Sequence, residues 1–348
     1  MTVLLYGAYG YTGELVAREA VDRGLDTVLA GRDGDALREL GRELRCSVRE
    51  FGLGIPEMVA DSVRDIDLVL NCAGPFAATA TPLVDACLEA GTDYLDVTGE
   101  FGVFADLADR NDEAVSAGTT LLPGVGFDVV PTDCLAARLV ERLPDATTLA
   151  LGFDANGGVS RGTARTAVRG LGEGIVVRED DRLVRIPIGI RTREIDFGRG
   201  PRSATAVPWG DVVTAAHTTG VSDVTVYAAV PPRFIRLVRL SRPLGPLLGT
   251  RPVRYLLDRV VAARVDGPSA AERAGNRVFV WGEAQTADGE SVVSRLKTPD
   301  PYEFTVEASL AAVERVLAGD APNGFTTPAG AFGSTFVDVV DGVEWADG

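Results

Sequence analysis

The stretch Thr2–Val16, TVLLYGAYGYTGELV, decides the fold of the N-terminal half. Residues 2–6 have the continuous apolar character of a buried parallel strand, and residues 13–23 have the pattern of a helix. Three glycines separate them: Gly7, Gly10 and Gly13. A strand, a glycine turn and a helix leave helix amides facing an anion such as a pyrophosphate, although glycines also make plain tight turns. We therefore expect a dinucleotide site here.

The first 125 residues continue to alternate apolar strands with helical patterns. Further strands are expected at residues 27–30, 46–51, 67–71, 93–98 and 119–124, and helices at 33–44, 56–63, 79–90 and 103–117. Near-continuous apolar strands between helices are typical of a parallel sheet covered on both faces. The pattern predicts an α/β fold with a doubly wound parallel Rossmann sheet.

The pattern changes after residue 130. Helices are expected at 132–143 and 162–171. Strands are expected at 148–154, 175–180, 182–188, 193–197 and 224–230. The strands 277–286 and 291–298 enclose Asp288-Gly289, a hairpin signal. We therefore expect residues 1–130 to form an NADP-binding domain and 131–301 a mixed α+β domain for substrate or dimerisation. The segment 302–348 is expected to pack back on the first domain.

The end of the second strand indicates which cofactor is bound. NAD sites usually place an acidic residue there to bind the ribose 2′-hydroxyl. This chain has Arg32, whose guanidinium can hold a 2′-phosphate, unless it only faces solvent. The neighbouring Asp33 is expected to cap the next helix. The pattern favours NADP(H) over NAD(H).

Ligands of open α/β sheets bind outside the carboxyl ends of the strands. Turns at Cys72–Phe76, Gly99-Glu100 and Gly126–Asp128 follow the fourth, fifth and sixth strands. Gly74 and Pro75 would turn the chain beneath the cofactor, and Phe76 would line the nicotinamide pocket. The alternative for the first turn is an ordinary strand-to-helix connection.

These stretches together resemble a known family. GAYGYTG (7–13), LAGRD (29–33), VLNCAGPF (69–76), ACLEAGTDYLDVTGE (86–100) and LPGVGFDVVPTD (122–133) resemble the saccharopine dehydrogenase-like oxidoreductases, in the branch that includes the trans-acting enoyl reductases. The resemblance is weaker between 150 and 300, and it returns in DPYEFT (300–305) and TTPAGAFG (326–333). Around residues 127–130 the chain departs from the lysine-pathway enzymes.

The resemblance implies an NADP(H)-binding Rossmann domain and oxidoreductase activity. With the turns above, the expected cofactor residues are Gly7, Tyr9, Gly10, Tyr11, Thr12, Gly13, Arg32, Cys72, Ala73, Gly74, Pro75, Phe76, Gly99, Gly126 and Phe127.

Hydride transfer also needs a group that supplies or accepts one proton. The candidates on the strand-end edge are Glu100, Asp128 and Tyr94. Asp128 could instead bind ribose or cap a helix, and Glu100 could be a solvated loop carboxylate. His217 is the sole histidine, and its position at an expected helix end suits a surface role equally well. No pattern of metal ligands is present in the sequence.

The substrate is indicated only weakly. Ser160, Arg161 and Thr163 could hold an anionic substrate group, or could cap and solvate a helix. Residues 231–264 carry eight arginines against Asp258 alone, interleaved with apolar residues. This segment could contact a membrane surface, line an apolar substrate pocket, or join the core or a dimer seam. We expect reduction of a polarised C=C bond in an enoyl substrate such as a lipid or isoprenoid. Imine reduction and non-catalytic NADP(H) sensing are the alternatives.

The composition indicates which partners and which cellular compartment to expect. The net charge is −16, which disfavours nucleic acid as a partner. The four cysteines are scattered as expected for free thiols in the cytoplasm, and no apolar run is long enough to span a membrane. Met1 leads directly into the first expected strand, so we expect no signal peptide.

The acidic surface generates a first prediction. There are 30 Asp, 20 Glu and 33 Arg residues but one Lys, a composition suited to a high-salt cytosol where self-repulsion is screened. We expect the thermal unfolding midpoint to rise with KCl concentration and the fold to be lost in dilute buffer. Circular dichroism at several KCl concentrations measures this, and full stability without salt would contradict it.

Overall fold

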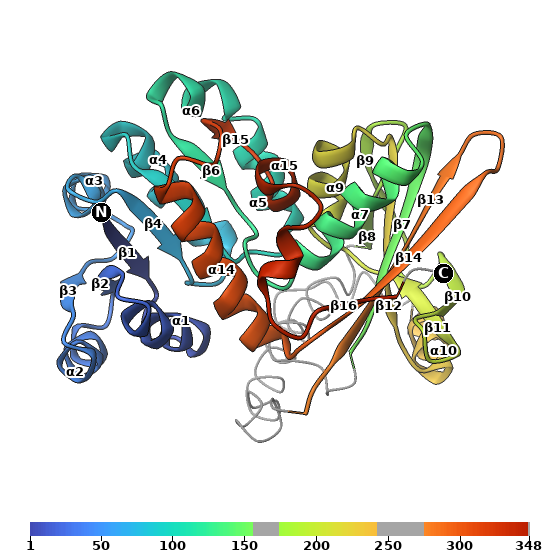
Figure 1. The fold of residues 1–348 in the computed structure, drawn as a ribbon, viewed down its shortest axis with the longest axis horizontal. Coiled ribbons are helices and arrows are strands. Elements are labelled where there is room, and N and C mark those ends of the chain that lie inside the picture. Colours follow the sequence, from blue (N-terminus) through green and yellow to red (C-terminus); the bar gives the residue numbers. More distant parts are fainter. Residues whose placement is uncertain (156–173, 242–274, 347–348) are drawn as a thin grey trace. The chain divides into compact units, whose positions relative to one another are not determined.

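A computed structural model describes residues 1–155, 174–241 and 275–346 (Figure 1). The chain divides into two compact units. Unit 1 holds Met1–Cys134 and Tyr302–Val340, and unit 2 holds Leu135–Pro301 and Asp341–Gly348. The division falls within helix α7 (Val130–Arg142), four residues after the domain boundary expected from sequence. It assigns residues 341–348 to unit 2, whereas the sequence placed them with the first domain.

Unit 1 is built on a seven-stranded sheet. Its strands are β1 (Thr2–Tyr6), β2 (Asp26–Gly31), β3 (Ser47–Glu50), β4 (Leu68–Asn71), β5 (Asp93–Asp96), β6 (Thr120–Leu122) and β15 (Gly324–Phe325). They lie in the order β3-β2-β1-β4-β5-β6-β15, and every pairing is parallel. The strand order reverses between β1 and β4, as in doubly wound folds. The predicted Rossmann sheet is confirmed.

Helices surround this sheet. Those of unit 1 are α1 (Tyr11–Asp22), α2 (Gly34–Leu44), α3 (Pro56–Val63), α4 (Phe76–Ala90), α5 (Phe101–Ala108), α6 (Asn111–Ala117), α14 (Pro301–Leu317) and α15 (Pro328–Phe332), with a 3-10 turn at Phe336–Val339. Residues Val3–Tyr6 and Leu68–Asn71 are buried along their whole length. This explains why these strands read as continuous apolar runs rather than as alternating ones.

Helix α14 lies beside α1, although their sequences are almost 300 residues apart (Figure 1). Arg23, at the end of α1, pairs with Glu19 at 2.9 Å, with Glu307, and with Glu314 at 3.7 Å. One guanidinium thus holds three carboxylates from two helices. This cluster attaches the C-terminal helix to the helix that follows the glycine turn.

Unit 2 is built on a mixed sheet. Its strands are β7 (Ala146–Ala155), β8 (Ile175–Glu179), β9 (Arg182–Ile186), β10 (Thr192–Asp196), β11 (Pro201–Ala206), β12 (Asp223–Ala229), β13 (Val278–Thr286), β14 (Ser291–Thr298) and β16 (Glu344–Trp345). The central path runs β10-β11-β12-β7-β13-β14-β16, with β8 paired to β12 and β9 paired to β8. Strands β7 and β12 are parallel and the other pairs are antiparallel.

The helices of unit 2 include α9 (Asp211–Thr219) and α10 (Pro232–Ser241). One sheet face packs on α7, where Gly282 is needed because a Cβ there would lie 2.7 Å from the Leu139 side chain. The predicted hairpin is present, with Gly289 at φ +95° in its turn. The mixed second domain is therefore confirmed as a fold class.

Two local predictions were wrong. Residues 103–117 form α5 and α6 rather than one helix, because Arg110 leaves helical geometry and its guanidinium binds Asp85 at 2.6 Å and Glu113 at 2.8 Å. Strand β11 was missed, because its sequence PRSATA has small residues where a strand signal needs bulky ones. The expected helix at 162–171 lies outside the described residues.

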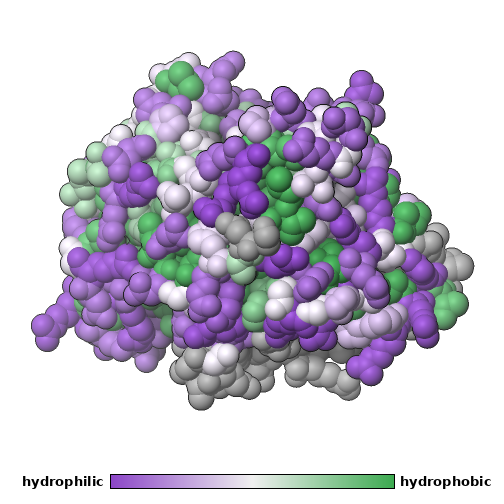
Figure 2. All heavy atoms as spheres, turned by 45° about the vertical axis from the view of Figure 1, so that its right-hand side comes forward, coloured by the Kyte–Doolittle hydropathy of each residue, from purple (hydrophilic) through white to green (hydrophobic). Residues whose placement is uncertain are grey.

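Among the described residues, no helix is long and apolar enough to cross a membrane. Hydrophilic residues, in purple, cover much of the face drawn in Figure 2. This surface agrees with the charge-rich composition.

The Arg23 cluster generates a second prediction. Arg23→Ala leaves three carboxylates facing one another, so we expect the unfolding free energy of unit 1 to fall by about 1–2 kcal/mol. Urea unfolding followed by far-UV circular dichroism measures this. Tryptophan fluorescence is not suitable, because all three tryptophans (Trp209, Trp281 and Trp345) lie in unit 2 and do not report on unit 1.

The matched control is Arg64→Ala, which removes an exposed ion pair with Asp61 at 2.8 Å. Exposed pairs contribute little, so this variant should change stability by less than about 0.5 kcal/mol. Equal losses of unfolding free energy in the two variants would show that the Arg23 cluster stabilises the fold no more than an exposed ion pair.

Candidate functional site

The glycine turn after β1 is sterically fixed. Gly7 has φ +82°, and a Cβ there would lie 2.8 Å from the Cβ of Ala73. A Cβ on Gly13 would lie 2.2 Å from the Gly7 carbonyl oxygen, and the Gly10 amide donates to that oxygen at 2.9 Å. Side chains at Gly7 and Gly13 are therefore excluded, and α1 can begin at Tyr11, directly behind the strand.

The start of α1 is open to an anion. Gly10 occupies the N-cap position and has no side chain that could cap the first amides of the helix. Uncapped amides and the positive end of the helix dipole attract phosphate oxygens. Tyr11 is 44% exposed here, so the helix start is not sealed by packing. The turn fits the pyrophosphate of a dinucleotide.

The end of β2 carries the predicted cofactor-selecting residue. Arg32 is exposed and forms no ion pair with any residue that the structure describes. A Cβ on Gly31 would lie 2.6 Å from the Tyr9 ring, so that ring covers the strand end beside Arg32. Asp33 accepts a hydrogen bond from the Ala36 amide at 3.1 Å, which confirms its role as a helix cap. Arg32 is thus available for a 2′-phosphate.

The turn after β4 is held by the side chain of Asn71. Its Oδ1 accepts from the Ala73 amide at 3.0 Å, and Thr79 donates to the Ala73 carbonyl at 2.7 Å. Ala73 also contacts the glycine turn, because it limits the space at Gly7. Cys72 is partly buried, and burial raises the pKa of its thiol to about 12, so it is no nucleophile.

Glu100 joins the turn after β5 to the turn after β4. Its two carboxylate oxygens accept from the amides of Phe76 at 3.0 Å and Ala77 at 3.1 Å. These are the first amides of α4, whose N-cap residue Pro75 makes no side-chain cap of its own. Glu100 therefore caps α4 from a distance of 24 residues, which also explains why this helix begins at Phe76 rather than at residue 79.

A buried carboxylate lies behind these turns. Asp96 accepts from the amides of Thr98 and Gly124, each at 3.0 Å, and from the Tyr94 hydroxyl at 2.8 Å. The Tyr94 hydroxyl in turn accepts from Asn71 Nδ2 at 3.1 Å. Burial, partly offset by these hydrogen bonds, raises the pKa of Asp96 to about 6. Burial also raises the pKa of Tyr94.

Asp128 lies in the turn after β6. A Cβ on Gly99 would lie 2.8 Å from the Asp128 Oδ2, so this carboxyl group stands against the turn after β5. It is partly exposed, and burial raises its pKa to about 6. A carboxyl group with this pKa can carry or release a proton near neutral pH.

These contacts bring the predicted turns together at one edge of the sheet, which we call the carboxyl edge. It consists of the turns at residues 7–13, 31–33, 72–76, 97–100 and 123–128. Sequence reasoning missed Asn71, Thr79, Asp96 and Thr305. Asn71 and Asp96 could have been found, because a polar residue ending an otherwise apolar strand is a signal for turn fixation.

Other predicted residues are placed elsewhere or not described. Ser160, Arg161 and Thr163 lie outside the described residues, as do 242–264 of the basic segment. In its described part, Ile235 is buried while Arg233 and Arg236 are exposed. The membrane, pocket and dimer interpretations of this segment stay predictions. His217 is an exposed residue in the last turn of α9.

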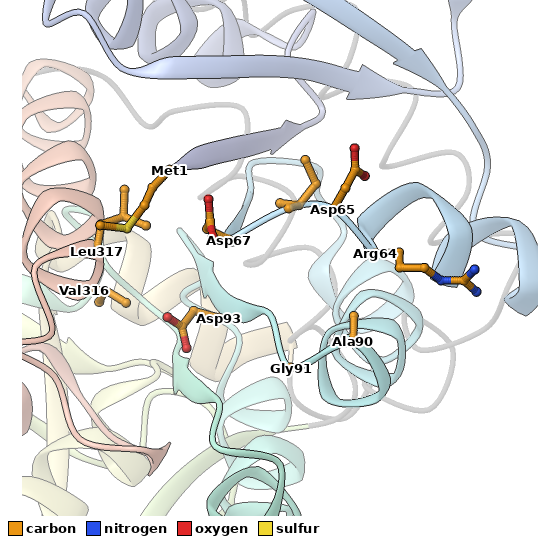
Figure 3. A pocket seen from close by; sticks show the side chains of 10 residues that line it. Met1, Arg64, Asp65, Asp67, Ala90, Gly91, Asp93, Val316 and Leu317 are labelled. Atoms are coloured by element: carbon orange, nitrogen blue, oxygen red, sulfur yellow. The ribbon is translucent and has the colours of Figure 1, made fainter.

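A hollow of about 500 Å³ lies at the opposite, amino-end edge of the unit 1 sheet (Figure 3). Asp67 and Asp93 point toward it. Asp67 accepts from the Thr2 amide at 2.6 Å, and Asp93 from the Thr120 amide at 2.7 Å. These carboxylates stabilise the sheet ends, and no metal-binding cluster occurs among the residues described.

The N-terminal third of the chain is similar to known proteins. Residues 3–122 match the family described as the saccharopine dehydrogenase NADP binding domain. A trans-acting enoyl reductase of Mycobacterium tuberculosis is 32% identical over 152 residues, which cover 40% of this chain and 35% of that protein. A trans-acting enoyl reductase of Mycobacterium leprae is 30% identical over 154 residues, covering 42% and 37%. The matches thus span little more than a third of these relatives.

A solved structure shares the fold of the whole chain. Apo saccharopine dehydrogenase (L-Glu forming) from Saccharomyces cerevisiae covers 99% of both chains with a TM-score of 0.65 and 12% identity. The family match confirms the prediction of NADP(H). Residues 3–122 are therefore similar to the saccharopine dehydrogenase NADP binding domain, and this match supports NADP(H) as the cofactor.

Proposed function

We propose that this chain is an NADP(H)-dependent oxidoreductase that reduces the polarised C=C bond of an enoyl substrate. The observation that carries the proposal is the glycine turn before α1, with Gly10 at the N-cap and Arg32 exposed at the end of the next strand, inside a stretch that matches an NADP-binding domain. Similarity to trans-acting enoyl reductases over the same residues supports the reaction type.

The cofactor-binding roles follow from the geometry of the carboxyl edge. The amides at the start of α1 hold the pyrophosphate, and the absence of side chains at Gly7 and Gly13 lets it approach the backbone. Arg32 binds the 2′-phosphate, with the Tyr9 ring beside it. The turns at 72–76 and 126–128 border the nicotinamide end.

The proton chemistry falls to Asp128. When bound, NADPH supplies a hydride to the β-carbon of the enoyl group, and the α-carbon then needs a proton. Glu100 is engaged in capping α4, and Tyr94 is fully buried and donates to Asp96. We assign the proton to the Asp128 carboxyl, and positioning roles to Glu100 and Tyr94.

The third prediction concerns cofactor choice. Arg32→Ala removes the charge that faces the 2′-phosphate, so we expect NADPH affinity to fall by a factor of about 10 to 100 and NADH affinity to change less than about threefold. Thermal shift titrations with each nucleotide measure this, since a ligand at about 100 times Kd stabilises the folded state by about 2.7 kcal/mol.

The matched control is Arg42→Ala, which removes an exposed arginine of α2 that donates to the Arg38 carbonyl at 3.0 Å. It changes the net charge equally and should leave both titrations unaltered. If Arg32→Ala weakens NADPH and NADH binding to the same degree, Arg32 does not select the cofactor.

The fourth prediction concerns Asp128. A proton donor must be protonated, so we expect kcat/KM of the wild type to fall as the pH rises above about 6. Asp128→Asn should lower kcat at least about 100-fold and remove this limb of the pH profile, while the NADPH thermal shift stays. NADPH consumption with an α,β-unsaturated acyl thioester provides the assay.

Asp106→Asn on α5 is the control, because Asp106 is an exposed carboxylate. Full activity of Asp128→Asn would remove the assigned role. A second assay uses a cyclic imine, which would separate imine reduction from enoyl reduction. NADPH binding without turnover of either substrate would favour an NADP(H)-sensing protein and contradict the proposed activity.

A further inference from the structure

The motif DPYEFT (300–305) has no place in the function proposed so far. It forms the first turn of α14, far along the chain from the carboxyl edge. In the folded unit this turn contacts the edge at two points. The contacts involve the start of α1 and the turn that carries Asp128.

The first contact is a hydrogen bond. The Phe127 amide donates to Oγ1 of Thr305 at 3.0 Å, across 178 residues of sequence. Thr305 is 9% exposed, so water has little access to replace it. A Cβ on Gly126 would lie 3.0 Å from the Thr305 Cγ2 and 3.2 Å from its Oγ1. Glycine at 126 thus lets the threonine reach the backbone.

The second set of contacts is aromatic. The rings of Phe304 and Phe127 meet edge to face with centroids 5.8 Å apart, and Phe304 is fully buried. The rings of Tyr302 and Tyr11 meet in the same way at 4.7 Å. One helical turn therefore touches both ends of the predicted cofactor site.

We propose that Thr305 is a positioning residue that fixes the turn 126–128, and through it the Asp128 carboxyl group. This inference rests on the proposed function of Asp128. The side chain of Asp128 follows the amide that Thr305 holds, so a shift of that turn moves the carboxyl relative to the cofactor. A misplacement of about 1 Å can lower a rate about 100-fold.

The proposed positioning depends on the hydroxyl group of Thr305, which accepts the hydrogen bond from the Phe127 amide. Thr305→Val keeps the shape of the side chain and removes the acceptor, which leaves the Phe127 amide without its partner. Thr305→Ser keeps the acceptor. The matched control is Thr92→Val, which removes the hydroxyl of another buried threonine, bonded to the Ile66 carbonyl at 2.9 Å just before β5. That position is at the amino-end edge of the sheet.

The first measurement needs no substrate. The peptide covering residues 123–130 contains the Phe127 amide, so its hydrogen–deuterium exchange responds to the loss of that hydrogen bond. We expect exchange there to be at least about 10-fold faster in Thr305→Val than in the wild type, and to be unchanged in Thr305→Ser and Thr92→Val. Unchanged exchange in Thr305→Val would overturn the proposal.

The second measurement is kinetic. Thr305→Val should lower kcat at least about 10-fold and displace the Asp128 limb of the pH profile, with the Kd for NADPH within about threefold of the wild type. Thr305→Ser should restore both values. If Asp128→Asn is inactive but Thr305→Val behaves like Thr92→Val, the positioning role is wrong.

The two hypotheses fail in different ways. If Asp128→Asn retains full activity, the assigned role of Asp128 fails, and the exchange experiment still decides whether Thr305 fixes the turn. If Thr305→Val has lost its fold by circular dichroism, Thr305→Ala and Thr305→Ser replace it. Exchange at residues 123–130 must then follow the presence of the hydroxyl, or the proposal is overturned.

Discussion

The carboxyl edge depends on one buried carboxylate. Asp96 accepts three hydrogen bonds, two from amides in the turns after β5 and β6 and one from Tyr94, which is bonded onward to Asn71 at the end of β4. Three neighbouring strand ends are therefore tied to one group. Its raised pKa of about 6 means that ionisation is unfavourable inside the fold, so the contribution of Asp96 to stability is greatest below about pH 4 and falls as the pH rises through 4 to 6. Three donors reduce that cost.

The other contacts of the edge build outward from this centre. The Thr98 hydroxyl accepts a hydrogen bond from the Glu100 amide at 3.0 Å and so fixes the backbone of Glu100. The Glu100 side chain then caps α4. The turns reached from Asp96 are thus held by neutral backbone groups rather than by exposed ion pairs. Such hydrogen bonds are little affected by salt, unlike the surface pairs of this acidic chain. A preformed edge needs little reorganisation when a cofactor binds.

Sequence patterns predicted the parts of the fold that depend on local chemistry. The glycine turn, the parallel strands, the Asp33 cap and the 277–298 hairpin each have a signal within about 15 residues. The long-range contacts have none. The Glu100 cap spans 24 residues and the Thr305 contact 178, so pattern reasoning assigned Glu100 to catalysis and left Thr305 unassigned. Strand β11 was missed because its small residues carry no periodicity.

The charge distribution poses a final physical problem for an anionic cofactor. A chain of net charge −16 repels a dinucleotide at long range, and this repulsion is screened within about 8 Å at 0.15 M salt and about 3 Å at 1 M salt. At the binding site itself the electrostatic potential must be positive, so that it attracts the dinucleotide. In the proposed site, the amides that follow the Gly10 N-cap and the exposed Arg32 would supply that positive potential locally. Binding at the proposed site would therefore rely on short-range hydrogen bonds, which persist at salt concentrations that suppress electrostatic steering.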